Sequence, residues 1–146
     1  MSTIRAKAVC IFRHHDNALL AEGYDPAKDE HYLIPIGGGI DFGETSEQAA
    51  RRETLEEIGA EAHSFELLGV LENLFSFDGK EGHEIVFVYE AKFVDISLYE
   101  EPELQGTESN GSKFVARWFS RNQLRTGNFH IYPSGIERIL FQQTNK

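Results

Sequence analysis

The sequence predicts an α/β protein in which helices cover both faces of a mixed β-sheet. Segments rich in Val, Ile and Phe, several with the alternation typical of strands, lie before and after one central acidic helix. Residues 134–142 predict a second helix near the C-terminal end. Strands on both sides of one helix, followed by another helix, favour a sheet that is packed on both faces.

Three strands are predicted before the central helix. They are expected at 4–13, 18–21 and 32–36, with a turn at Asp16-Asn17 and a polar loop at 22–30. Pro35 lacks a backbone N–H and therefore indicates an edge strand or a strand end. Gly37-Gly38-Gly39 then predicts a flexible loop whose backbone can approach a ligand closely.

Extended structure is predicted for most of the chain after the helix. The expected elements are strands at 65–77 and 84–94 joined by an Asp78-Gly79 turn, an acidic loop at 97–112 and a strand at 114–119. Ser134 is expected to cap the last helix, with Ile136, Ile139 and Leu140 facing inward.

The central helix has clear end signals. Thr45-x-x-Gln48 is a capping-box pattern, Ser46 is an alternative cap, and Gly59 is a C-terminal stop. At about 100° per residue, one side carries a stripe suited to packing on a sheet: Ala50, Thr54, Leu55 and Ile58. The other sector holds Ala49, Arg52, Glu53, Glu56 and Glu57.

Three glutamates on one and a half turns repel each other, and a divalent cation in front of them would relieve that repulsion. Taken alone, the pattern is more typical of a solvated face on which Arg52 pairs with Glu56. Clustered carboxylates supply hard oxygen ligands, which suit Mg²⁺ or Mn²⁺. Zinc is disfavoured because no Cys or His residues have ligand spacing.

Composition limits the classes of function. The 146 residues fit a single domain over 1–146, and a net charge of 14 − 24 = −10 argues against a nucleic-acid polymer as partner. The single cysteine, Cys10, cannot form an intrachain disulfide and is expected in the core. With no basic-then-apolar leader and no apolar run near 18 residues, we expect a cytoplasmic location without a membrane.

A longer spacing pattern decides between the two interpretations of the helix. Gly38, five residues, Glu44, seven residues, then Arg52-Glu53-x-x-Glu56-Glu57-x-Gly59 is similar to the Nudix box. All charged and glycine positions agree, and the departures are Thr54 and Ala60, which stand where bulky aliphatic residues are usual. The chain therefore resembles the Nudix hydrolases, and its length resembles the compact MutT-like members.

The resemblance implies a fold and a reaction. The fold is an α/β/α sandwich with a mixed sheet between helices, and the reaction is Mg²⁺-dependent hydrolysis of a nucleoside diphosphate linked to a group X, with Mn²⁺ as an alternative metal. The implied metal ligands are Glu53, Glu56, Glu57 and the Gly38 carbonyl. Arg52 is implied to orient the glutamates, and Glu44 to hold loop and helix together.

The same glutamates are the implied catalytic residues. A general base must take a proton from the attacking water. Glu56 is the first choice within the box and Glu57 the next. Because family members also recruit a base from outside the box, four loop residues stay candidates beside the interpretation that they are solvated charges: Glu100, Glu101, Glu103 and Glu108.

The candidate substrate-binding residues are Arg5, Asn73, Phe75 and His83, with Lys7, Phe77, Phe129, His130 and Tyr132 as further ones. Basic residues on the first strand could reach phosphates, and aromatic side chains could stack on a base. The alternative is that the basic residues are merely exposed and that the aromatics are core or hairpin pairs. A nucleoside triphosphate is the favoured substrate.

Two other functions remain open. One is a non-catalytic Nudix module that senses a nucleotide or nucleotide sugar, although such modules often lose box glutamates that this chain keeps. The other is a protein-docking surface on the acidic helix, with a vestigial motif. A homodimer is compatible with the resemblance.

Overall fold

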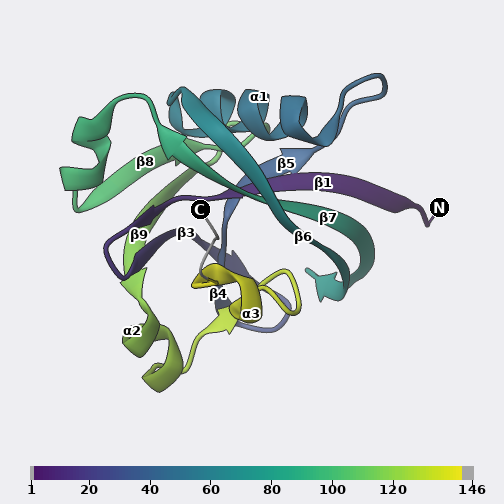
Figure 1. Ribbon diagram of the computed structural model, residues 1–146. Helices are drawn as coiled ribbons and strands as arrows, with labels where there is room; N and C mark the ends of the chain where they lie inside the picture. Colours follow the sequence, from purple (N-terminus) through teal and green to yellow (C-terminus); the bar gives the residue numbers. More distant parts are fainter. Residues whose placement is uncertain (1, 143–146) are drawn as a thin grey trace.

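The computed structural model describes residues 2–142, which form two β-sheets between helices (Figure 1). The first sheet has the strand order β5-β1-β7-β6. Its strands are β1 (Ile4–Ile11), β5 (Ile36–Gly39), β6 (Ala62–Phe77) and β7 (Lys80–Phe93). Strand β1 runs parallel to β7 and antiparallel to β5, so this sheet is mixed, as predicted.

The second sheet has the order β10-β4-β3-β9-β8, with β2 paired to β3. Its strands are β2 (Arg13–His14), β3 (Asn17–Asp25), β4 (Glu30–Ile34), β8 (Glu103–Thr107), β9 (Lys113–Ser120) and β10 (His130–Ile131). The helices are α1 (Ser46–Ile58), the 3₁₀ helix η1 (Ile96–Glu100), α2 (Arg121–Thr126) and α3 (Glu137–Leu140). Figure 1 shows α1 and α3 on opposite sides of the strands, as the predicted α/β/α arrangement requires.

The ends of α1 confirm the local prediction. The Thr45 side chain accepts a hydrogen bond from the Gln48 amide at 3.1 Å, and the Gln48 side chain accepts one from the Thr45 amide at 2.8 Å. Gly59 adopts the left-handed conformation at φ 66° and donates to the Leu55 carbonyl. Both helix ends therefore follow from short-range hydrogen bonding.

The buried face of α1 differs from the predicted stripe. Ala49, placed on the acidic sector, is fully buried, whereas Leu55, expected to anchor the helix, is 51% exposed. Thr54 is buried and donates to the Ala50 carbonyl at 2.8 Å. The small residues let α1 approach the sheet closely, and the helix turns the Glu53 side towards the protein. Cys10 is buried beneath Thr54, which confirms its predicted place in the core.

Several predicted boundaries are wrong. Gly37-Gly38-Gly39 is not a free loop, because it pairs with β1 as part of β5. Strand β3 runs on to Asp25, so the predicted polar loop at 22–30 shrinks to four residues between β3 and β4. The Asp78-Gly79 hairpin turn is confirmed between β6 and β7.

The C-terminal half contains structure that was not predicted. The segment 97–112, which was predicted to be an acidic loop, includes part of η1 and all of β8. In β8, buried Leu104 alternates with exposed Gln105, but the run is too short to predict a strand. Helix α2 and strand β10 were missed. The last helix is shorter than expected and lacks a Ser134 cap, but Ile136, Ile139 and Leu140 are buried as predicted. In residues 2–142, no helix has the length and apolar character needed to span a bilayer.

Candidate active site

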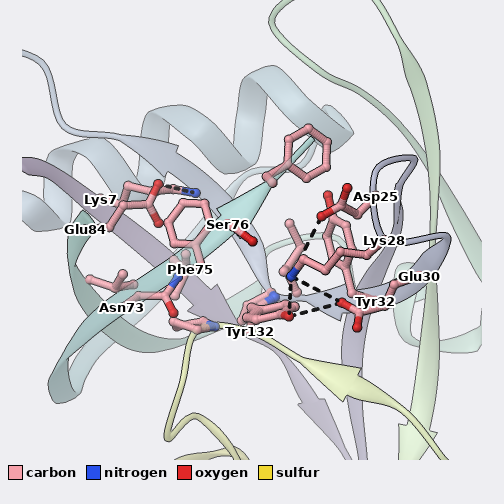
Figure 2. Close-up of a pocket in the computed structure, with 16 residues that line it drawn as sticks. Lys7, Asp25, Lys28, Glu30, Tyr32, Asn73, Phe75, Ser76, Glu84 and Tyr132 are labelled. Atoms are coloured by element: carbon pink, nitrogen blue, oxygen red, sulfur yellow. Dashed lines mark hydrogen bonds and ion pairs between the residues drawn. The ribbon is translucent and has the colours of Figure 1, made fainter. Parts of the chain in front are cut away.

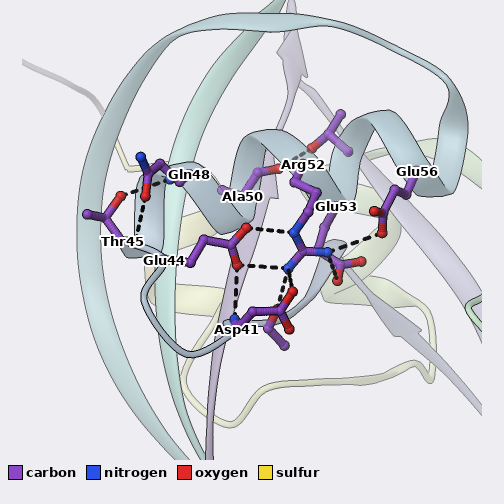
Figure 3. Close-up of polar contacts among 10 residues, drawn as sticks. Asp41, Glu44, Thr45, Gln48, Ala50, Arg52, Glu53 and Glu56 are labelled. Atoms are coloured by element: carbon purple, nitrogen blue, oxygen red, sulfur yellow. Dashed lines mark hydrogen bonds and ion pairs between the residues drawn. The ribbon is translucent and has the colours of Figure 1, made fainter.

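Arg52 lies at the centre of the acidic helix face (Figure 3). Its guanidinium donates two hydrogen bonds to Glu44, at 2.6 and 2.9 Å, and one to the Gly39 carbonyl at 2.9 Å. It also donates to Glu53 at 2.9 Å and to Glu56 at 3.1 Å. The fork of Arg52 thus joins the helix to the segment that precedes it, as the resemblance implied, and also makes the predicted i, i+4 pair.

Glu44 is held in its ionised form by this contact. The hydrogen bonds from Arg52, followed by one from the Asp41 amide at 2.9 Å, lower the pKa of Glu44 to about 2. A carboxylate bound in this way cannot readily serve as a proton acceptor. Its position favours a structural part in the site.

Glu53 lies directly against strand β5. A Cβ atom built on Gly38 would stand 2.5 Å from the Glu53 carboxyl carbon, so only glycine leaves room for this side chain. The pairing of β5 with β1 fixes the Gly38 backbone, and the Arg52 contact fixes the carboxylate. Glu53 and the Gly38 backbone, two of the implied metal ligands, are therefore adjacent.

Glu57 is the most perturbed acid of the site. It accepts a hydrogen bond from the Gly37 amide at 3.3 Å. Burial, followed by the charges of Glu108 and Glu53, raises the pKa of Glu57 to about 8. Negative charge therefore gathers here from α1 and from the loop after β8.

The four loop glutamates differ in position. Glu108 lies close enough to Glu57 to raise its pKa, whereas Glu100 faces His14 at 3.8 Å and Glu103 faces Arg117 at 3.3 Å. Glu101 uses its backbone carbonyl to accept a bond from the Trp118 indole at 2.9 Å. Among these four, Glu108 is the one whose charge acts on Glu57 of the acidic helix.

The donor set at α1 fits a hard divalent cation. In the described part of the chain, no three Asp, Glu, His or Cys side chains are already arranged around a cation position. Glu53 and Glu56 point to Arg52 instead. Burial is the main cause of the raised pKa of Glu57, and the charges of Glu108 and Glu53 add to it; an Mg²⁺ or Mn²⁺ ion would compensate this carboxylate charge with oxygen ligands.

A cavity of about 180 Å³ lies near this face, lined by strands of both sheets and the loop before α3 (Figure 2). Lys7 lines it and also acts on Glu57, whose pKa it partly lowers. Glu108 acts on Tyr32 in the cavity wall as well as on Glu57. The cavity therefore adjoins the glutamate cluster.

The predicted substrate residues fall into two groups. Asn73 and Phe75 line the cavity, as does Tyr132. Arg5 and His83 instead line a neighbouring hollow at the β6–β7 hairpin. The Asn73 side chain is 5% exposed and accepts a bond from the Ser134 amide at 3.0 Å, so it also holds the loop before α3 in place.

Phe129 and His130 do not line the cavity. The Phe129 ring packs edge-on against Phe119 with centroids 5.5 Å apart, and His130 lies 3.3 Å from Glu30. The lining residues that sequence reasoning missed include four polar ones between positions 25 and 32: Asp25, Lys28, Glu30 and Tyr32. They lie in or beside a segment that was interpreted as a polar loop.

Solved structures share this fold. A MutT NUDIX hydrolase from Burkholderia pseudomallei superposes with a TM-score of 0.64 at 22% identity, over 99% of this chain and 100% of the other. A NUDIX hydrolase from Nitrosomonas europaea gives a TM-score of 0.64 at 22% identity, over 90% of this chain and 82% of the other.

Curated relatives are similar over part of their length. One is an oxidized purine nucleoside triphosphate hydrolase of Danio rerio, 28% identical over 61% of this chain and 49% of the relative. Another, described as a candidate mutator protein MutT4 of Mycobacterium tuberculosis, is 38% identical over 57% of this chain and 39% of the relative. The matched region thus spans half or less of these relatives.

The NUDIX domain family matches residues 2–138 of this chain. This match includes the glycine strand, the acidic helix and every strand of both sheets. Together with the shared fold, it shows that this chain belongs to the Nudix family.

Proposed function

We propose that this protein is a divalent-metal-dependent hydrolase that cleaves the pyrophosphate bond of a nucleoside diphosphate linked to a group X, with a nucleoside triphosphate as substrate. The main support is that Glu53 and Glu57 both contact β5 and that the charge of Glu108 acts on Glu57, with a cavity nearby. The similarity to an oxidized purine nucleoside triphosphate hydrolase supports the substrate class.

Glu53, Glu56, Glu57 and the Gly38 carbonyl would hold Mg²⁺ or Mn²⁺, which neutralises phosphate charge and acidifies a bound water. Arg52 keeps Glu53 and Glu56 together and is the positioning residue of the site. Lys7, between cavity and helix, would contact a phosphate oxygen. Such a reaction depends mainly on positioning and charge neutralisation.

Glu108 is our candidate for the general base. It comes from a loop outside the metal-binding set and lies close enough to Glu57 to raise its pKa. Glu56, the first choice from the sequence, is exposed, and its Oε1 already accepts a hydrogen bond from Arg52. Glu57 stays the alternative within the box.

A hydrolysis screen tests the proposal. The purified chain is incubated with nucleoside triphosphates, nucleoside diphosphate sugars and dinucleoside polyphosphates, with Mg²⁺ or Mn²⁺, and the products are identified. We expect a nucleoside monophosphate and pyrophosphate from a triphosphate. No product from any substrate, with folded protein, would contradict the proposal, and calorimetric binding without turnover would support a sensor instead.

Variants of α1 supply matched controls. Glu56→Gln is expected to lower kcat by about 100-fold or more, because a charged ligand is lost. Glu47→Gln removes the same charge from the first turn of α1, where Glu47 pairs only with Arg51 at 3.4 Å. We expect this control to keep full activity, and equal losses in both variants would refute the assignment of the glutamate face.

A further inference from the structure

Asp25 ends strand β3 at the wall of the cavity, and its two carboxylate oxygens have different surroundings (Figure 2). The residue is 1% exposed. Oδ1 accepts hydrogen bonds from the amides of Ala27 and Asp78, both at 3.0 Å. Oδ2 is buried and accepts none; within residues 2–142 it is the one buried side-chain oxygen or nitrogen without a hydrogen-bond partner.

The lysine beside Oδ2 does not satisfy it. The Lys28 ammonium stands 3.8 Å from Oδ2, outside hydrogen-bond range, and lies 3.5 Å from the Tyr132 hydroxyl. Glu30, in the same cavity, has a closer partner, because it accepts a hydrogen bond from the Tyr132 hydroxyl at 3.1 Å. A buried acceptor left open is costly to a fold, and its persistence at a cavity indicates a ligand donor.

Aromatic rings form the walls around this polar end. Tyr32 packs edge-on against Tyr132 and against Phe77, with centroids 5.8 and 6.2 Å apart, and Phe75 lines the same space. A cavity of about 180 Å³ exceeds the roughly 150 Å³ that accommodates a benzene ring. One flat heterocycle with a polar edge therefore fits, with its face on an aromatic ring.

The position of the cavity orients such a ring. Lys7 lines the cavity and pairs with Gly39 of β5, the strand that contacts Glu53, so a ring bound near Asp25 has its attached phosphates on the side of the acidic helix. Asp25 Oδ2 and the Lys28 ammonium then offer an acceptor and a donor side by side. A ring edge with an amino group next to a ring nitrogen, as in adenine or cytosine, complements that pair.

We propose that Asp25 is the specificity-determining residue for the nucleobase: its Oδ2 accepts a hydrogen bond from an exocyclic amino group, and Lys28 donates to the adjacent ring nitrogen. The proposal rests on the proposed function, because it places the base of the same nucleotide whose phosphates meet α1. Bases with a carbonyl in place of the amino group would turn an oxygen towards Oδ2 and are disfavoured.

The test compares bases that differ at one position, ATP with ITP and CTP with UTP. We expect the wild-type protein to favour the amino member of at least one pair by about 10-fold in kcat/KM. Asp25→Asn keeps Oδ1 as an acceptor for Ala27 and Asp78 but replaces the open oxygen with a donor. It should abolish or reverse that preference.

Asp29→Asn is the matched control. Asp29 lies in the same turn and accepts a bond from the Tyr24 hydroxyl at 2.6 Å, outside the cavity. We expect it to leave the ratio unchanged. If Asp25→Asn does not fold, Lys28→Met replaces it; losing the ammonium should also lower the preference, since the ring nitrogen of the amino base loses its donor.

The outcomes separate this inference from the proposed function. An equal ratio in wild type and variant would overturn the role of Asp25, even if all substrates are cleaved more slowly, because a purely structural residue affects both members of a pair alike. If no nucleotide is hydrolysed, the proposed function fails. In that case the same ratios are measured as calorimetric affinities, and a preference that Asp25→Asn abolishes would still support the base site, whereas equal affinities would overturn it.

Discussion

The carboxylates that Arg52 binds at the acidic helix face contrast with Asp25 in the cavity wall. On α1, Arg52 bonds to Glu44, Glu53 and Glu56 together, so charge is paired before any ligand arrives. In the cavity, Asp25 keeps one oxygen open. The hydrogen bonds of Arg52 fix the positions of the glutamate side chains on the helix. The open oxygen of Asp25 is instead available to accept a hydrogen bond from a ligand, which is the basis of the proposed base selectivity.

The largest expected effect tests how closely the helix face is packed. Gly38→Ala would place a Cβ atom 2.5 Å from the Glu53 carboxyl carbon and displace this side chain. We expect a loss of about 100-fold in kcat, since a displacement near 1 Å can cost that much. In Gly79→Ala the added Cβ meets nothing within 4 Å, but the φ of 77° strains the turn, so this variant controls for a loss of stability away from the helix face. Full activity in Gly38→Ala would refute the close approach.

Glu57 is the exception on the helix face, and its titration provides the next test. Its pKa is raised from 4.5 to about 8, so between these values the folded protein keeps a proton that the unfolded chain has lost. The free energy of unfolding of the metal-free protein should therefore fall as the pH rises through this window. Glu57→Gln should remove part of that slope and melt several degrees higher at pH 8.

Bound metal should reverse the order of the thermal midpoints of the wild type and Glu57→Gln. Added Mg²⁺ stabilises the folded state in proportion to its binding, so the wild type should gain more in thermal midpoint than Glu57→Gln. Identical pH slopes and identical metal responses in the two proteins would contradict the assignment of Glu57. The measurement is a thermal melt at several pH values with and without the cation.

Two substitutions of Asp25 separate the contributions of its two carboxylate oxygens to the free energy of unfolding. Asp25→Ala also removes Oδ1 and leaves the amides of Ala27 and Asp78 without their acceptor, which should cost about 1–3 kcal/mol in the free energy of unfolding. Asp25→Asn should cost clearly less, because it keeps that acceptor. Denaturant unfolding measures both, and equal losses would show that the ionised form itself supports the fold.

The smallest effect is expected at Leu55. Because this residue is 51% exposed, Leu55→Gln should change the free energy of unfolding by less than about 0.5 kcal/mol. Ala50→Gln, on the buried face of the same helix, is the contrasting variant and should destabilise the protein strongly. A large loss in the free energy of unfolding for Leu55→Gln would show that Leu55 packs against the sheet, as the helical spacing predicted.

Features set by neighbouring residues were predictable. Contacts between residues that are close in sequence form the helix caps at Thr45 and Gly59 and the turn at Asp78-Gly79. The residue types that make these contacts, and the spacing of the box, can be read directly from the sequence. The family and the fold class followed from the same spacing. The metal and the catalytic roles stay predictions.

Features set by distant contacts were not predictable. The rotation of α1 depends on how closely Ala49 approaches the sheet, and the glycine strand depends on β1 as its partner. Which loop glutamate reaches Glu57 depends on where β8 ends in space, and the four candidates look alike along the chain.

By itself, the sequence determined the helix, its capped ends and the order of charges along it, because hydrogen bonds and helical spacing act over a few residues. Only the tertiary structure decided that the charge of Glu108 acts on Glu57 and that Asp25 keeps an open oxygen beside Lys28. Charge, burial and hydrogen-bond satisfaction at these positions are properties of strands brought together from distant parts of the chain.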